Sequence, residues 1–386
     1  MRALPLEYSL RGLSRGRTRT LLALLGSLVA GALIATASAF LQGMESALGA
    51  SASPSRVIVM GAGSEESLER SEIGARVPGI LSASVQGIRR TAGMEHVSAE
   101  THVALPIAHG GDASNDNGLA RGVGPAALLV HPEVQLLDGR WPERGAGEVL
   151  AGRSALRRLG IDPDAAIGDT ITLAGVPLRI VGTMRAPGST IDGEWWMPIE
   201  DLTTLMRRET ISCVIVDLDR ATIGDVQAFT LSRLDLELAV LAERDYYSGL
   251  LAFFAPVRVL VAVVAALMAL AAALGGASAL AAAFSERVRE NAVLETLGYP
   301  RPAVILDVLL QCTIVAVSGA LAGGLLARWL FGGMLVEFSM GTFALHFDAR
   351  ATLLAAVTGF IVAIVAAFLS TWRWIGLPTP EALRTT

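Results

Sequence analysis

The stretch Val259–Gly298 reads VLVAVVAALMALAAALGGASALAAAFSERVRENAVLETLG and combines the two features that decide the fold of this chain. Its first part, Val259–Ser285, has no charged residue and exceeds the roughly 20 helical residues that cross a bilayer core. Its second part, Ser285–Gly298, is rich in charge and ends at a glycine, as a short capped helix does. Since backbone groups in lipid must hydrogen-bond to one another, the first part predicts a transmembrane helix.

Three more stretches lack charge for a similar length: Leu21–Met44, Val308–Ala327 and Ala351–Trp372. The first of them follows a basic segment, as a signal sequence does. Its apolar part exceeds the ~7–15 residues of a signal peptide, so we expect an uncleaved anchor. Of the 386 residues, 52% are hydrophobic and 17% are charged, which favours a membrane protein over an ordinary soluble enzyme. We therefore predict an α-helical membrane protein with four transmembrane helices.

The charged residues exclude two classes of function. The formal net charge of -5 argues against a sequence-independent nucleic-acid binder, which needs a basic excess. All 31 basic residues are arginines, whereas the phosphate loop of ATP-binding proteins requires a lysine. This sequence therefore contains no such loop, and we expect it to bind no cofactor.

Residues 45–247, between the first two spans, have the composition of a folded soluble domain. Short apolar runs alternate with glycine, proline and aspartate, which predicts a large mixed α/β domain with one core or two small lobes. Strands are expected at 56–60, 97–107, 148–151, 169–173, 176–183, 195–198, 211–218 and 236–240, and helices at 78–91, 154–159, 199–207 and 222–231. From Glu243 a helical pattern runs into the second span, which predicts one continuous helix.

Arginines in the short flanks of the spans predict the orientation. They gather before the first span, between the second and third, and after the fourth, so we expect both termini in the cytoplasm. The chain is then a multi-pass protein of the inner or plasma membrane whose α/β domain is extracytoplasmic. The predicted segments are 1–20 (cytoplasmic), 21–44 (helix 1), 45–247 (external domain), 248–285 (helix 2 with its external extension), 286–304 (cytoplasmic coupling helix and loop), 305–330 (helix 3), 331–350 (short external loop), 351–372 (helix 4) and 373–386 (cytoplasmic tail).

The side chains outside the spans form no catalytic constellation that we can identify. The five histidines have no ligand-like spacing, so we expect them scattered on the surface without a metal: His96, His102, His109, His131 and His346. Cys213 and Cys312 are expected to be buried apolar residues without a disulfide.

Small residues in the second and third spans provide grooves in which another helix can approach closely. They are Gly275, Gly276, Gly319 and Gly323. These glycines predict a helix–helix interface, which lies either between two subunits or within one.

The segment Ser285–Gly298 is predicted to be a short amphipathic helix that joins two spans. Ser285 caps its start, and Gly298 with Pro300 beyond ends it. Apolar residues can line one face while charged residues cover the rest. Such a helix is either a connector on the membrane surface or a ridge that docks into the cleft of a partner.

This segment resembles the signature of FtsX-like permease domains, with Asn291 and Glu295 departing from the usual pattern. Other segments resemble the MacB-type periplasmic core domain and the closing motif of the family. They are Leu137–Pro142, Gly147–Ala155, Gly168–Leu173, Arg179–Thr183 and the tail Pro378–Arg384. The order of one span, an external domain and three further spans is also similar to that family.

The resemblance implies a permease subunit of a type VII ABC transporter. It implies pairing with a second permease subunit, identical or different, and with a separate cytoplasmic ATPase that holds the ATP and magnesium; a periplasmic adaptor is a further partner. The residues implied to couple to the ATPase are Glu286, Arg287, Val288, Arg289, Glu290, Val293, Leu294, Glu295 and Gly298. The work done outside is expected to be efflux or export, with lipoprotein release and activation of an envelope enzyme by a non-transporting scaffold as the alternatives.

Overall fold

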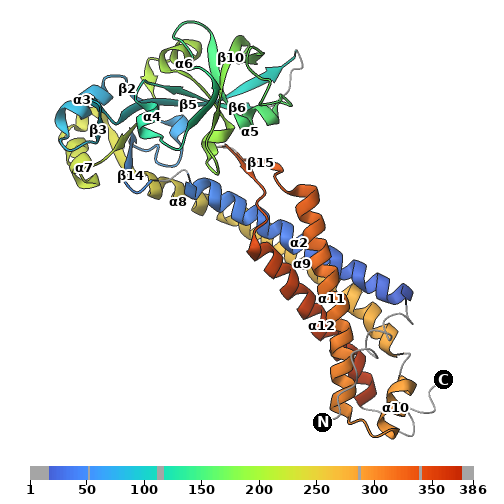
Figure 1. The fold of residues 1–386 in the computed structure, drawn as a ribbon. Coiled ribbons are helices and arrows are strands. Elements are labelled where there is room, and N and C mark those ends of the chain that lie inside the picture. Colours follow the sequence, from blue (N-terminus) through green and yellow to red (C-terminus); the bar gives the residue numbers. More distant parts are fainter. Residues whose placement is uncertain (1–16, 51–52, 111–116, 286–287, 339–340, 376–386) are drawn as a thin grey trace. The chain divides into compact units, whose positions relative to one another are not determined.

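A computed structural model describes residues 17–50, 53–110, 117–285, 288–338 and 341–375 of the chain (Figure 1). These residues divide into two compact units. The helical unit contains the chain up to residue 42, residues 256–334 and the chain from 345 onward. The α/β unit contains residues 43–255 and 335–344.

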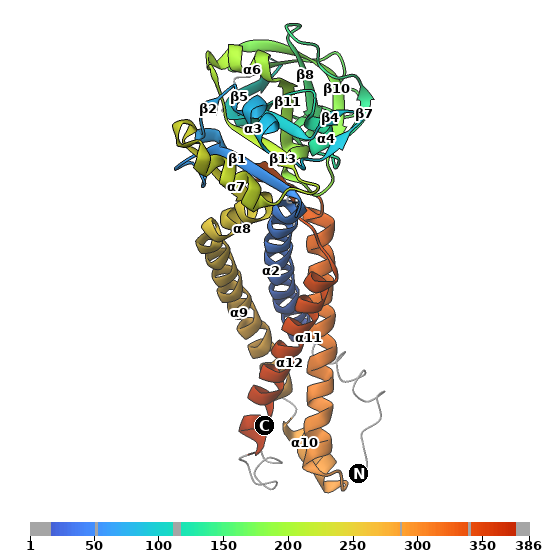
Figure 2. The same cartoon turned by 90° about the vertical axis from the view of Figure 1, so that its left-hand side faces the viewer.

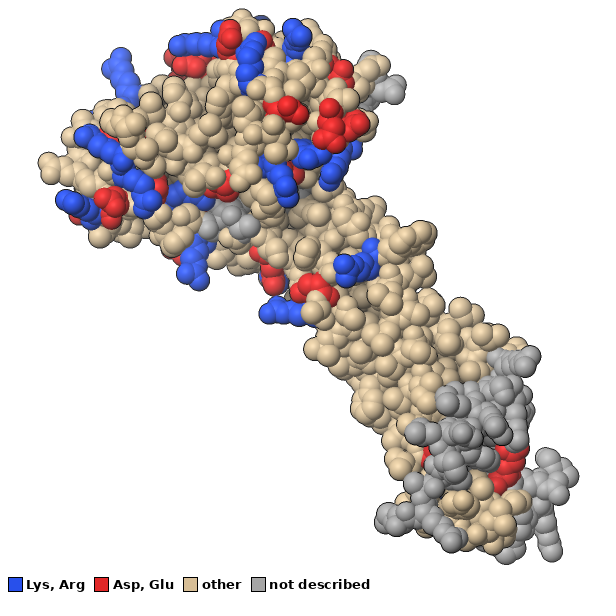
Figure 3. All heavy atoms as spheres, viewed as in Figure 1, with Lys and Arg blue, Asp and Glu red and all other residues tan. Residues whose placement is uncertain are grey.

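Four helices in the described residues are long and apolar enough to cross a membrane, as predicted. They are α2 (Arg17–Ala50), α9 (Ala255–Ser285), α11 (Arg301–Phe331) and α12 (Ala349–Ile375). Figure 2 shows these helices beside one another, and Figure 3 shows few charged side chains along them. The helix α10 (Val288–Thr296) lies between α9 and α11 in the sequence.

Glycines bring the helices of this unit into backbone contact. A Cβ atom added at Gly319 of α11 would lie 2.7 Å from the Leu24 carbonyl oxygen of α2, and one at Gly323 would overlap the Leu28 carbonyl oxygen. Gly359 brings α12 equally close to Ala316 of α11. Without a hydrophobic driving force between helices in lipid, such close packing is a main source of their association.

The α/β unit is built on one mixed sheet of ten strands, in the order β14-β1-β13-β5-β6-β11-β8-β10-β7 with β9 beside β10 and β5. Since β9 pairs with both β10 and β5, the strands β5, β6, β11, β8, β10 and β9 close into a ring. The strand bounds are β1 Arg56–Gly61, β5 Val97–His109, β6 Asn117–Val123, β7 Gln135–Gly139, β8 Glu148–Gly152, β9 Thr170–Leu173, β10 Val176–Arg185, β11 Glu194–Pro198, β13 Cys213–Asp217 and β14 Leu238–Ala242. Short pairs β2 (Ile73–Gly74) with β12 (Thr210–Ile211) and β3 (Arg90–Thr91) with β4 (Met94–Glu95) lie outside this sheet.

Three hydrophobic clusters among the described residues support this sheet. One packs the ring against α5 (Arg153–Arg158) and α6 (Ile199–Met206), around residues such as Trp195. Another packs β1 and β13 against α3 (Val77–Ser84) and α7 (Ile223–Ser232), around Leu81. The third includes Trp196 of β11 and Ala127 of α4 (Ala127–Val130), the short helix that follows β6.

Two predictions about helices in this unit were wrong. The helix expected at 78–91 ends at Ser84, because Val85 is extended and Gly87 has φ +91° in the left-handed region. The helix expected to run on from Glu243 is interrupted: α8 (Glu243–Phe253) ends before α9 begins at Ala255. Pro256 lacks the N–H that would continue the helical hydrogen bonds at this point, and the sequence analysis overlooked it.

The loop expected at 331–350 contains a hairpin that the sequence analysis did not predict. Its strands are β15 (Leu335–Phe338) and β16 (Gly341–Ala344), and both belong to the α/β unit. β16 contacts the 3-10 turn Thr190–Gly193, and Phe343 packs on Gly43 of α2. Residues 335–344 of this loop are thus part of the folded α/β unit.

The close contact of α11 with α2 predicts that substitutions at two glycines have different effects on the stability of the helical unit. Gly323→Val should weaken the helical unit by ~1–3 kcal/mol, because the new methyl groups overlap the Leu28 carbonyl. Gly275→Val is the matched control, since no atom lies within 4 Å of a Cβ at Gly275. Thermal unfolding of the full chain in detergent measures both, and equal melting temperatures would contradict the close packing.

Candidate functional site

The corner between α10 and α11 is the site that the sequence singled out. The amide N–H groups of Gly298 and Tyr299 donate to the carbonyls of Glu295 and Leu294, at 3.0 and 3.1 Å, and close the end of α10. Gly298 adopts φ +89°, which a residue with a side chain rarely adopts. Pro300 is the N-cap residue of α11, so only a short turn joins α10 to α11.

The side chains described at this corner differ in exposure. Val293 and Glu290 are exposed, and Leu294 is half-buried. Glu295, expected to face a partner, accepts a hydrogen bond of 2.8 Å from Arg301 across the corner. Glu286 and Arg287, and the side chains of Val288 and Arg289, lie outside what the structure describes. The docking face of α10 therefore stays a prediction.

The four glycines proposed for a helix–helix interface differ in their surroundings. Gly319 and Gly323 face the backbone of α2 in the same chain, and a Cβ at Gly276 would lie 3.2 Å from the Ala23 carbonyl oxygen of α2. Gly275 has no neighbouring atom within 4 Å of such a Cβ. Three of the four thus pack within one chain, and an interface between subunits remains a prediction.

A buried ionic cluster in the α/β unit was missed by the sequence analysis. It contains three arginine or histidine side chains and four carboxylates: Arg56, Arg121, His131, Glu100, Glu133, Glu194 and Glu243. All of them except Glu133 are buried. They come from strands and loops far apart in the sequence, so no local spacing could reveal them.

Arg121 forms the centre of one half of this cluster. Its Nε and one terminal nitrogen donate to the two carboxylate oxygens of Glu194, both at 2.6 Å, and the other nitrogen donates to Glu100 at 2.9 Å. The Glu194 carboxylate also accepts from the indole N–H of Trp196 at 2.8 Å. Planar bidentate pairing of this kind is the strong form of a charged hydrogen bond.

His131 connects the residues around Arg121 to Glu133, which pairs with Arg56. Its Nε2 lies 2.8 Å from Glu100, and its Nδ1 lies 3.3 Å from Glu133. Burial would lower the pKa of His131, but the nearby Glu100 carboxylate outweighs it and raises the pKa to about 9. Burial would likewise raise the pKa of Glu133, whereas its hydrogen bond with His131 lowers the pKa to about 2.

Arg56 and Glu243 tie the start of β1 to the start of α8. The Nε of Arg56 donates to Glu243 at 2.6 Å, and the backbone N–H of Ser53 donates to the same oxygen at 2.8 Å. The domain leaves α2 just before Ser53 and reaches α9 through α8. One carboxylate therefore holds together the two ends of the chain segment that forms the domain.

The prediction that the histidines are scattered on the surface was wrong for three of them. His96, His102 and His131 are buried beside carboxylates. Their burial comes from strand pairing: His102 and Arg121, for example, face each other across β5 and β6. Histidine spacing along the chain carries no information about such pairs. The two cysteines are buried and free, as predicted.

Within the described residues, one group offers a possible set of metal ligands: Glu100, His102 and Cys213, whose ligand atoms lie within 4.8 Å of one another. However, Glu100 already pairs with Arg121 and His131, which place positive charge beside it. Burial also raises the pKa of the Cys213 thiol well above its usual value, which opposes the thiolate that a metal would need. This chemistry fits a structural cluster better than a metal site.

Two family models match the chain. The MacB-like periplasmic core domain matches residues 20–228, more than half of the chain, and the FtsX-like permease C-terminal model matches residues 262–379. Among curated proteins, the macrolide export ATP-binding/permease protein MacB of Bordetella avium is 20% identical over 316 residues. That match covers 77% of this chain but 47% of the relative, so the chain spans about half the relative's length.

Among solved structures, the periplasmic region of MacB from Actinobacillus actinomycetemcomitans matches with a TM-score of 0.38 and 14% identity. It covers 49% of this chain and 89% of that one. The extracellular domain of the noncanonic ABC-type transporter YknZ from Gram-positive bacteria matches with a TM-score of 0.37 and 14% identity, covering 48% and 99%.

The raised pKa of His131 predicts that the α/β unit loses stability as pH rises. Between about pH 6.5, the ordinary histidine value, and about 9, the folded state holds a proton that the unfolded state releases. The free energy of unfolding should therefore fall with a slope of up to ~1.4 kcal/mol per pH unit. Denaturant unfolding of the full chain, followed by tryptophan fluorescence, measures this slope.

His131→Gln keeps a hydrogen-bonding side chain without the titratable charge, and it should flatten the slope between pH 6.5 and 9. His109→Gln is the matched control, because His109 is about one-third exposed and lies 3.9 Å from its carboxylate. An unchanged slope in His131→Gln would show that His131 is not the titrating group.

Proposed function

The chain belongs to the MacB-type, FtsX-like family of ABC transporter permeases, and we propose that it couples ATP hydrolysis on a separate cytoplasmic protein to movement of its α/β domain outside the membrane. The observation that supports this most directly is the corner between α10 and α11. The short helix α10 is closed by Gly298 and joined to α11 through Pro300. A force applied to α10 can therefore be transmitted to α11 without a change in the shape of this corner.

The proposed topology places α10 on the side of the ATPase. The arginines that flank the spans at both termini and around α10 put these segments in the cytoplasm by the positive-inside rule. The α/β unit is then extracytoplasmic, in agreement with the periplasmic core domain that its sequence matches. ATP and magnesium would bind to the partner, since this sequence has no phosphate-loop lysine.

Export is the outcome that we propose for this movement. The support for it is the relative from Bordetella avium, whose name describes macrolide export. Two copies of the permease, identical or different, would pair in the membrane, and a periplasmic adaptor would be a further partner. Arg287, Arg289, Glu290 and Glu295 would contact the ATPase through charge, and Val288, Val293 and Leu294 would enter its cleft, with Glu286 and Gly298 at the two ends of the helix.

Charge reversal on α10 tests the coupling. Arg289→Glu combined with Glu290→Arg should abolish co-purification of the ATPase from detergent extracts, because the charged contacts are reversed while the helix length is unchanged. Membrane insertion should not change. The matched control is Arg144→Glu with Glu200→Arg, an exposed pair at 3.3 Å in the α/β unit, which should leave co-purification intact. Full recovery of the ATPase with the α10 variant would mean that α10 is only a connector.

Thiol labelling tests the topology. The two native cysteines are buried, so an introduced cysteine can be followed alone. Glu290→Cys should resist a membrane-impermeant maleimide in intact spheroplasts and react only after the membrane is opened, whereas Arg144→Cys, in the α/β unit, should react in both. Labelling of Glu290→Cys from outside would contradict the proposed orientation.

A further inference from the structure

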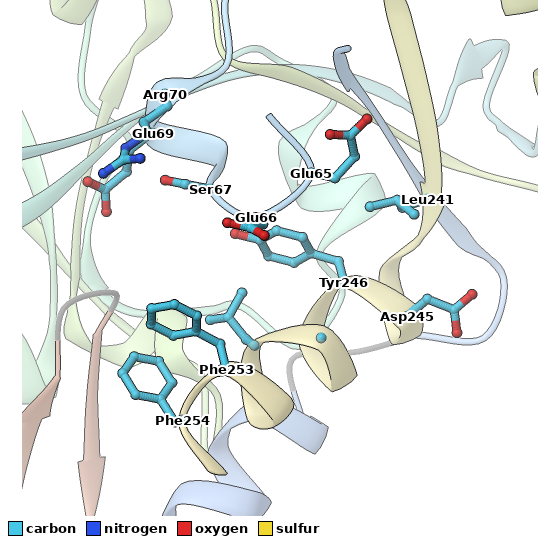
Figure 4. A pocket seen from close by; sticks show the side chains of 12 residues that line it. Glu65, Glu66, Ser67, Glu69, Arg70, Leu241, Asp245, Tyr246, Phe253 and Phe254 are labelled. Carbon is cyan, nitrogen blue, oxygen red and sulfur yellow. The ribbon is translucent and has the colours of Figure 1, made fainter. Parts of the chain in front are cut away.

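The α/β unit contains a cavity of about 710 Å³ that the coupling scheme does not use. It lies between the acidic segment Glu65–Arg70 and the helix α8 (Figure 4). Its volume is in the range of sites that hold drug-sized molecules, which is about 300–1,000 Å³. All of its lining residues belong to the α/β unit.

One side of the cavity is aromatic. Figure 4 shows Tyr246 and Phe253 of α8 on the side of the cavity opposite segment 65–70, with Phe254, the residue after α8, beside Phe253. Phe253 and Phe254 lie edge to face, with ring centroids 5.2 Å apart, and the ring of Phe253 is 71% exposed. The backbone N–H of Leu68 donates to the Tyr246 hydroxyl at 3.4 Å, which fixes this aromatic side against the acidic segment. An exposed ring of this size at a cavity mouth indicates a surface that a ligand can cover.

The segment opposite α8 is acidic. Glu65, Glu66 and Glu69 line the cavity from this segment, and Asp245 of α8 adds a fourth carboxylate. Arg70 is the one basic side chain among the lining residues. Among the residues that the structure describes, no salt bridge uses any of these four carboxylates. Glu69 is half-buried, and burial raises its pKa. The cavity therefore presents negative charge that no described cation neutralises within ion-pair distance.

We propose that this cavity binds an amphiphilic organic cation of drug size. The aromatic rings attract both the apolar body of such a ligand and its positive charge, through the negative faces of the rings. The carboxylates favour the cation and disfavour anionic lipid headgroups. This inference rests on the proposed export function and names the chemical class of a molecule that the chain would take up, at a helix that leads directly into α9.

The probe is tetraphenylphosphonium, with tetraphenylborate as its anionic counterpart of nearly the same shape. Binding to the full chain in nanodiscs is measured by equilibrium dialysis, and empty nanodiscs correct for uptake into lipid. We expect saturable binding of the cation that weakens as salt rises, since partly exposed charges are screened. Saturable binding of tetraphenylborate with similar affinity would overturn the proposal.

Two variants assign binding to this cavity. Glu66→Gln with Glu69→Gln should weaken binding of the cation by about tenfold, because two nearby charges are removed without a change in shape. Phe253→Ala should weaken binding of the cation as well. Because the Phe253 side chain is mostly exposed, we expect this variant to fold normally. Glu209→Gln is the matched control on an exposed carboxylate outside the cavity, and it should bind normally.

The outcomes separate this inference from the proposed function. If neither variant changes binding, or if Phe253→Ala alone does, the site is elsewhere or is a non-selective apolar surface, and the proposal fails. The ATPase co-purification is independent of these results, because the assay uses the permease without its partner. A normal ATPase complex with no cation binding would overturn the cavity proposal and leave the coupling proposal intact.

Discussion

The need of the backbone to satisfy its own hydrogen bonds in lipid is the constraint on which this structure depends. In α2, α9, α11 and α12 apolar side chains predominate and offer the backbone no hydrogen-bond partners, so the helix satisfies its own polar groups. Some polar side chains follow the same rule: Ser27 and Ser370 donate to backbone carbonyls one turn earlier, at 2.9 and 2.6 Å, whereas Gln311 donates to the Asp307 carboxylate at 2.7 Å. Packing must then come from close backbone contact, which Gly323 and Gly359 permit.

The main segment of the α/β unit begins after α2 and ends before α9, so its two ends come from separate helices and must be held together. The ion pair of Arg56 with Glu243 does this at the point where β1 and α8 begin. Behind it, Glu100 and Arg121 continue the pairing into the centre of the sheet. Buried pairs of this kind add little net stability over apolar residues, but the loss of one partner is costly. Such a cluster fixes the relative positions of the strands and the helix that contribute its residues.

The helix α8 contributes residues both to the ionic cluster and to the cavity. Glu243 at its start pairs with Arg56 in the ionic cluster, Tyr246 and Phe253 line the cavity, and the helix ends before α9 begins at Ala255. A break at this point means that motion between the span and the domain passes through a short junction and not through one rigid rod.

The sequence by itself determined the four spans, the capped helix before Gly298 and most strands of the α/β domain. These depend on local composition and on short-range rules such as the absence of charge over Val259–Ser285 and the end of a helix at Gly298. Only the tertiary structure decided that Gly323 faces α2, that residues 335–344 join the α/β unit, and that Arg121 meets Glu194 and Glu100. Each of these contacts joins residues distant in sequence, and their pairing depends on strand register and helix packing, which no local pattern records.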